Sequence, residues 1–304
     1  MSMLANVTKG RVIRPVLMLL YGPGGIGKST WGAKTPAPIF LGSEEGTDLL
    51  DVARFPKPKS FEDILTGVRE LIEAAHEYKT LVIDSLDWIE PLIYAAVCKR
   101  YGVSSIEKAA GGYGKGYLEA LDEWTAFMDL LTALRDKRKM NIVLLAHPSI
   151  ENHTDPHTQA TYQRYELKLN KKAKQKVMEY VDAMFYATYE TFTKKDGDTV
   201  KAVVSDRRVM YPNWQQGFDA KNRYGLQQEI DLAISWEDFI KLCNIVPKPP
   251  VMSAEEVDFH VKNLLPQIKD EETRKRAEEA ITKAGGDLTR LTMYVEKLKA
   301  LTLN

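Results

Sequence analysis

This chain owes its fold to Gly22-Pro23-Gly24-Gly25-Ile26-Gly27-Lys28-Ser29-Thr30, which directly follows the apolar run at residues 16–21. The spacing is that of a G-x-x-x-x-G-K-[ST] phosphate loop in its required place between a strand and a helix. Glycines there let successive backbone N–H groups turn toward phosphate oxygens, and the N-terminus of the next helix adds the positive end of its dipole. We therefore predict that residues 22–30 bind nucleotide phosphates. The alternative is a glycine-rich turn with a solvated lysine.

Three polar side chains have distinct expected roles at this site. Lys28 neutralises charge on the β- and γ-phosphates, and Ser29 ligates Mg²⁺. The run Thr80-Leu81-Val82-Ile83-Asp84 is apolar and ends in a carboxylate about fifty residues after the loop. Asp84 is expected at the carboxyl edge of the sheet, where it holds the water shell of Mg²⁺. ATP and Mg²⁺ are the predicted cofactors.

The composition fits one large α/β domain with an appendage. The chain has 304 residues, of which 44% are hydrophobic. Its 42 Lys and Arg residues balance 42 Asp and Glu residues, so any nucleic-acid surface must be a local patch. The apolar run at residues 16–21 is too short for a signal or a membrane span, so we expect a cytoplasmic protein with no membrane partner.

Apolar runs and helical periodicity alternate along the first part of the chain. Strands are predicted at residues 16–21, 39–41, 80–84 and 141–146, and helices at 28–34, 60–78, 86–101 and 117–138. This order predicts a mostly parallel central sheet flanked by helices on both faces. Residues 111–116 and 149–163 are predicted as loops, the first of them mobile. Trp88, Trp124 and Trp236 are expected in the core.

The remaining chain predicts a hairpin and a helical module. Strands at 165–169 and 183–189 flank a helix at 174–180, and Asp-Gly at 196–197 marks a hairpin turn. We expect a core at 1–245, a proline-rich linker at 246–252 and a helical module at 253–304. The module's helices are predicted at 254–265, 271–284 and 288–303.

Two acids follow the second predicted strand. Glu44 and Glu45 lie in Gly42-Ser43-Glu44-Glu45-Gly46-Thr47. A carboxylate at this strand end can polarise a water for in-line attack on the γ-phosphate, which makes Glu45 the candidate base. The alternative is a solvated pair of acids in a loop.

These motifs resemble those of the RecA-like recombinase ATPases, and more closely those of phage single-strand annealing ATPases and related phage nucleotide-binding proteins. The resemblance covers about residues 12–235 and rests on stretches 22–30, 45–47, 81–85, 144–147 and 221–223. It implies a RecA-like P-loop NTPase fold with Glu45 as the general base.

The same resemblance implies three further roles. His147 would occupy the sensor position that reads the γ-phosphate, although the family often has Gln there. Lys221 and Arg223 would reach across a subunit interface to the neighbour's ATP as a finger in trans. The alternatives are a histidine satisfied in the core and a solvated Lys-x-Arg turn.

By resemblance the two predicted loops correspond to paired DNA-binding loops. Aromatic residues alternate with cations in and after them, a pattern that suits base stacking and phosphate tracking along a single strand. The predicted DNA contacts are Lys115, Arg164, Lys168, Lys171 and Lys172. The alternative is a solvated helix face.

The resemblance implies an oligomeric ATPase, as a ring or filament, that binds single-stranded DNA and promotes annealing or strand exchange in phage recombination. The alternatives are a replisome helicase or helicase-loader ATPase, and a nucleotide-gated scaffold with little hydrolysis. The C-terminal helices are expected to self-associate or to dock a single-strand-binding protein. If phage-encoded, the protein is expected in the cytoplasm of the bacterial host.

Overall fold

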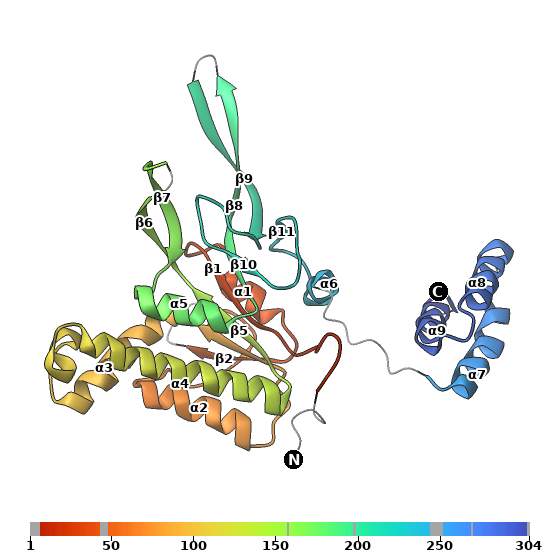
Figure 1. Ribbon diagram of the computed structural model, residues 1–304, viewed down its shortest axis with the longest axis horizontal. Helices are drawn as coiled ribbons and strands as arrows, with labels where there is room; N and C mark the ends of the chain where they lie inside the picture. The colour runs from red at the N-terminus through yellow and green to blue at the C-terminus, as the bar shows by residue number, and fades with distance from the viewer. Residues whose placement is uncertain are drawn as a thin grey trace. The chain divides into compact units, whose positions relative to one another are not determined.

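The computed structural model describes residues 7–42, 48–156, 158–196, 199–243, 252–268 and 270–302. The chain divides into two compact units, residues 1–245 and 246–304. The first unit is a sheet flanked by helices (Figure 1). The second contains α7 (Ala254–Leu264), α8 (Glu271–Lys283) and α9 (Leu288–Thr302). Apart from Met252, the predicted linker at 246–252 lies outside the described residues.

The central sheet is mostly parallel, as predicted. Its strand order is β11-β9-β8-β1-β5-β4-β2-β3, and β10 pairs with β8. The pairs among β1, β2, β3, β4 and β5, and the β1–β8 pair, are parallel, whereas β9, β10 and β11 run antiparallel to their partners. The strands are β1 (Leu17–Tyr21), β2 (Pro38–Gly42), β3 (Ala53–Arg54), β4 (Thr80–Asp84), β5 (Asn141–Ala146), β8 (Ala183–Asp196), β9 (Thr199–Tyr211), β10 (Lys221–Asn222) and β11 (Ile230–Asp231).

Helices bury both faces of this sheet, which explains why its central strands are apolar throughout. In β1, Leu17 and Leu19 face one hydrophobic cluster and Met18 and Leu20 face the other. The first cluster lies under α2 (Phe61–Glu73), α3 (Leu86–Tyr101), α4 (Lys115–Arg138) and α5 (Lys171–Tyr180). The second lies under α1 (Lys28–Ala33) and α6 (Trp236–Leu242). The polar side chains of β4 and β5 are thus limited to the ends of these strands.

The loop predicted at residues 149–163 is a hairpin, so that prediction was wrong. Residues 149–163 lie largely in a hairpin of β6 (Pro148–Thr154) and β7 (Thr161–Leu167), paired from Pro148↔Leu167 to Thr154↔Thr161. Most of its residues are exposed or half-exposed, so the ribbon has no apolar alternation to detect. In the other predicted loop, at 111–116, residues 112–114 form a turn between η3 (Ile106–Gly111) and α4, and the two ends of the segment are helical.

The glycine stretch is needed for close packing at one position. A Cβ on Gly116 would lie 2.0 Å from the carbonyl oxygen of Ile106, so α4 approaches η3 too closely for any side chain there.

Trp88 also departs from expectation, because 52% of it is exposed at the start of α3, whereas Trp124 and Trp236 are buried. In the described part of the chain, no helix has the length and apolarity to span a bilayer.

Gly22→Ala is expected to lower the free energy of unfolding by about 1–3 kcal/mol. Its Cβ would lie 2.3 Å from the backbone oxygen of Ala187, so β8 must shift. Gly24→Ala is the control, because nothing lies within 4 Å of its added Cβ. Thermal unfolding of the two variants measures the difference, and equal midpoints would contradict this role for Gly22.

Candidate nucleotide-binding site

The phosphate loop forms an arch between β1 and α1. Gly25 and Gly27 adopt left-handed backbone conformations, with φ of 78° and 106°, which glycine tolerates without strain. Lys28 is buried, and its Nζ donates to the carbonyl oxygens of Gly22 at 2.8 Å and Pro23 at 3.0 Å. The ammonium therefore lies within the loop, at the carboxyl edge of the sheet.

Ser29 and Asp84 meet beside this loop, as the two motifs predict. The Ser29 hydroxyl donates to Asp84 Oδ2 at 2.5 Å, joining the first turn of α1 to the last residue of β4. A hydroxyl and a carboxylate oxygen fit Mg²⁺, which usually takes one or two protein oxygens together with substrate phosphates and water. Within the described ranges, no group of three or more His, Cys, Asp or Glu side chains could hold a metal ion.

His147 and Asp87 form a second polar pair at this edge. His147 follows β5, which lies between β1 and β4, and its backbone N–H donates to Asp87 Oδ1 at 3.0 Å. Its Nδ1 lies 3.1 Å from Asp87 Oδ2. Burial favours a higher pKa for Asp87, but hydrogen bonds and charge from His147, with help from Ser85, hold that pKa below its ordinary value. His147 is thus fixed between the loop and Asp84.

Sequence reasoning missed Asp87, although a signal was present. It lies in the first turn of α3, three residues after Asp84, where an acid also complements the helix dipole.

Glu45 lies outside the described residues. Gly42, the last residue of β2, pairs with Asp84, so β2 leaves the sheet at the edge that bears the phosphate loop. The role of Glu45 as a base therefore stays a prediction.

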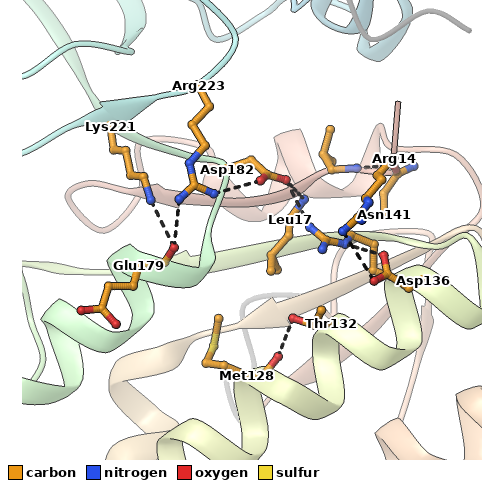
Figure 2. A network of polar contacts seen from close by, with 12 residues as sticks. Arg14, Leu17, Met128, Thr132, Asp136, Asn141, Glu179, Asp182, Lys221 and Arg223 are labelled. Atoms are coloured by element: carbon orange, nitrogen blue, oxygen red, sulfur yellow. Dashed lines mark hydrogen bonds and ion pairs between the residues drawn. The ribbon is translucent and has the colours of Figure 1, made fainter. Parts of the chain in front are cut away.

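Lys221 and Arg223 lie at the opposite, amino edge of the sheet, because Lys221 pairs with Met184 near the start of β8. Figure 2 shows both side chains beside Glu179 and Asp182. Lys221 Nζ donates to the carbonyl oxygen of Met178 at 2.5 Å, and the Arg223 guanidinium donates to that of Glu179 at 3.2 Å. Arg223 also pairs with Asp182 at 3.4 Å, and 53% of its side chain stays exposed. Burial, followed by the charge of Arg223, lowers the pKa of Lys221.

A cation-rich pocket opens at this amino edge. Its volume is about 390 Å³, and Asp182 lies among the arginines that line it. Arg135 pairs with Asp182 at 3.3 Å, and the backbone N–H of Leu17 donates to the same carboxylate. The pocket's arginines are Arg11, Arg14, Arg135 and Arg223. Positive charge therefore exceeds negative charge at this end of the sheet.

Arg164 is a correction to the predicted DNA contacts. Only 6% of its side chain is exposed, and its Nη2 lies 2.5 Å from Asp219 Oδ1. Its guanidinium also lies 5.4 Å from the centre of the Trp214 ring. Arg164 therefore pairs with an acid inside the fold. Because Asp219 is 55 residues away in the sequence, no local pattern could reveal this pair. The other predicted contacts, Lys115, Lys168, Lys171 and Lys172, are exposed.

The parallel sheet and the arch of residues 22–30 define a P-loop α/β protein. The chain matches the AAA domain family over residues 14–224, more than half of its length, and the protein belongs to that family. It therefore carries a domain of the ATPase type, of the kind that takes a nucleotide with Mg²⁺.

Two further similarities are more distant. The SPbeta prophage-derived uncharacterized protein YorG of Bacillus subtilis (strain 168) is 25% identical over 117 residues, covering 37% of this chain and 35% of the relative. The match thus spans about a third of that relative's length. A crystal structure of the RadB recombinase aligns with 65% of this chain and 80% of its own, at 12% identity and a TM-score of 0.36.

Asp87→Asn is expected to lower the free energy of unfolding by about 1–3 kcal/mol at neutral pH, because His147 loses an ionised acceptor. The folded-state pKa of Asp87 is depressed. Its stabilisation is therefore present above the unfolded pKa and is lost as pH falls through the folded value, below about pH 4.

Urea unfolding at neutral pH and near pH 3 measures this dependence. Glu237→Gln is the control, an exposed acid in the first turn of α6. If Asp87→Asn and Glu237→Gln unfold alike at both pH values, the Asp87–His147 pair does not stabilise the site.

Proposed function

We propose that the protein hydrolyses ATP with Mg²⁺ at interfaces between copies of itself, and that these copies assemble on single-stranded DNA during recombination. The position of Lys221 and Arg223, at the edge of the sheet opposite the phosphate loop, carries this proposal. Membership of the AAA domain family supports the ATPase part.

The distance across the sheet argues for a role in trans. β10 pairs with the start of β8, and the backbone N–H of Asp182, just before β8, donates to the carbonyl oxygen of Leu17. Five residues of strand, about 16 Å, separate Leu17 from the first residue of the phosphate loop. Arg223 therefore lies too far from its own loop to reach a bound triphosphate, whereas a neighbour's loop can approach its exposed guanidinium.

At each interface one copy would supply the phosphate loop and the next would supply the finger. Lys28 binds the β- and γ-phosphates, and Ser29 and Asp84 hold Mg²⁺. Glu45 orients the attacking water, and Arg223 stabilises charge that develops on the transferred phosphoryl group. His147, held by Asp87, lies where it can respond to the γ-phosphate.

DNA is proposed to bind beside the β6–β7 hairpin. Lys168 follows β7, and Lys171 and Lys172 form the first turn of α5, all with exposed side chains. Tyr162 and His153 pair across the hairpin with ring centres 5.4 Å apart. Exposed cations beside aromatic rings suit a single strand, whose bases stack while its phosphates are neutralised.

The prophage origin of the Bacillus subtilis relative supports a phage protein acting in the cytoplasm of a bacterial host. Annealing or strand exchange fits a protein that holds single strands and assembles with ATP. The helical unit at residues 252–302 would serve self-association or docking to a single-strand-binding protein. No observation favours a helicase role over this one.

Lys28→Ala and Arg223→Ala are each expected to reduce ATP turnover with poly-dT by at least about a hundredfold. Mixing the two variants should restore turnover, because an intact loop from one copy then meets an intact finger from the other. Random mixing completes about a quarter of the interfaces. Steady-state phosphate release from each variant and from the mixture measures this effect.

Arg69→Ala serves as the control, because Arg69 is an exposed arginine of α2 that pairs with Glu62. Normal turnover by Arg223→Ala, or a mixture that stays inactive, would refute the finger in trans. Glu45→Gln is expected to bind ATP without turnover. If Lys28→Ala keeps assembly and DNA binding and the wild type hydrolyses no ATP, the nucleotide-gated scaffold is the better description.

Replacing Lys171 and Lys172 together by Gln is expected to weaken poly-dT binding and to make its salt dependence shallower by about one unit of log–log slope. Fluorescence anisotropy across a salt series measures both quantities. The control is Lys99 and Lys137 replaced together by Gln, two exposed lysines near the ends of α3 and α4. If both double variants bind alike, the strand does not cross the start of α5.

A further inference from the structure

The β8–β9 hairpin extends past the phosphate loop. Tyr21, the last residue of β1, pairs with Tyr186, and β8 continues from there to Asp196. Figure 1 shows β8 and β9 projecting beyond the end of β1. Residues of the hairpin just after Tyr186 therefore lie level with the loop and form a wall beside it.

Arg208 of β9 reaches from this wall to the loop itself. Its Nη1 donates to the carbonyl oxygen of Ile26 at 3.3 Å. The same nitrogen lies 2.9 Å from where a Cβ on Gly27 would stand, so the guanidinium lies against the loop's backbone. No carboxylate in the described residues forms an ion pair with Arg208, and the side chain is exposed.

The neighbouring Arg207 shows what an arginine of this strand does when it has only a structural role. It pairs with Glu190 at 2.8 Å and with Asp231 at 3.5 Å. Alternation along β9 places it on the opposite face from Arg208. Arg207 thus pairs with two acids. Arg208 instead lies against the phosphate loop, and its side chain is exposed to solvent.

Tyr189 stands beside Arg208. The two residues are direct cross-strand partners, which places their Cβ atoms about 5 Å apart. Ala187 and Met210, two positions before and after them, belong to the cluster that α1 covers. Tyr189 and Arg208 therefore share the α1 face of the hairpin, and 41% of Tyr189 is exposed.

We infer that Tyr189 and Arg208 form the platform on which the base of the bound nucleotide stacks, an inference that rests on nucleotide binding at the phosphate loop. A tyrosine ring and a planar guanidinium both offer flat faces on which a base can stack. The hydrogen bond to Ile26 fixes the guanidinium at the mouth of the loop. The base then lies beside β8 and β9, while the triphosphate runs toward Lys28 and Asp84.

A stacked platform reads the face of a base and not its hydrogen-bonding edge. The ligand class is therefore nucleoside triphosphates with little discrimination between adenine and guanine, and GTP is expected to bind within about tenfold of ATP. A much larger preference for either purine would overturn the platform as the source of base recognition.

Titration calorimetry with Mg²⁺ and two probes tests the platform. The probes are a non-hydrolysable ATP analogue and inorganic tripolyphosphate, which has no base. Tyr189→Ala and Arg208→Ala are each expected to bind the ATP analogue about tenfold or more weakly and to bind tripolyphosphate within about twofold of wild type. Tyr189→Phe should behave as wild type, because the ring remains.

Arg207→Ala is the matched control and should bind both probes normally. If Arg208→Ala and Tyr189→Ala bind the ATP analogue as tightly as Arg207→Ala does, the inference is wrong. The inference is also wrong if Arg208→Ala and Tyr189→Ala weaken binding of tripolyphosphate as much as binding of the ATP analogue, since the defect then lies in the phosphate loop. A wild type that binds neither probe would instead overturn the proposed function, and this inference with it.

Discussion

Burial of both faces of the parallel sheet is the constraint on which the rest of this structure depends. Every residue of β1 and β4 is buried, so these strands have no solvent-exposed face for polar chemistry. Asp84 is the last residue of its strand, and its carboxylate accepts a hydrogen bond from Ser29. At the amino edge, Arg14 and Arg223 are half-exposed, whereas Arg135 is buried against Asp182. The fold thereby has polar groups at both ends of the sheet, with Lys28, Ser29 and Asp84 at one end and the arginines around Asp182 at the other.

The fold and the centre of the site could be predicted because their signals are local. A phosphate loop needs glycines at fixed spacing, and buried parallel strands need unbroken apolar runs, so both are visible in short windows. The Ser29–Asp84 contact followed from two such windows, since parallel strands on either side of β5 end at the same edge. The fold class is confirmed for this reason.

What could not be predicted depends on partners far apart in the sequence. The burial of Arg164 requires Asp219, and the position of Arg208 requires Ile26, 182 residues away. Most residues of the β6–β7 hairpin are exposed or half-exposed, so its sequence lacks the apolar alternation that predicts a strand. Trp88 matches a helical apolar pattern, yet it lies in the first turn of α3 and is 52% exposed.

Asp182 connects the cationic end to the sheet itself. Its carboxylate binds Arg135 of α4, Arg223 of the surface and the backbone N–H of Leu17, while its own N–H donates to Leu17. A neighbour that draws Arg223 away would thus act directly on the first residue of β1. Because β1 is short and packed on both faces, a displacement of Leu17 would move the whole strand. The phosphate loop, which follows the other end of β1, would then move with it.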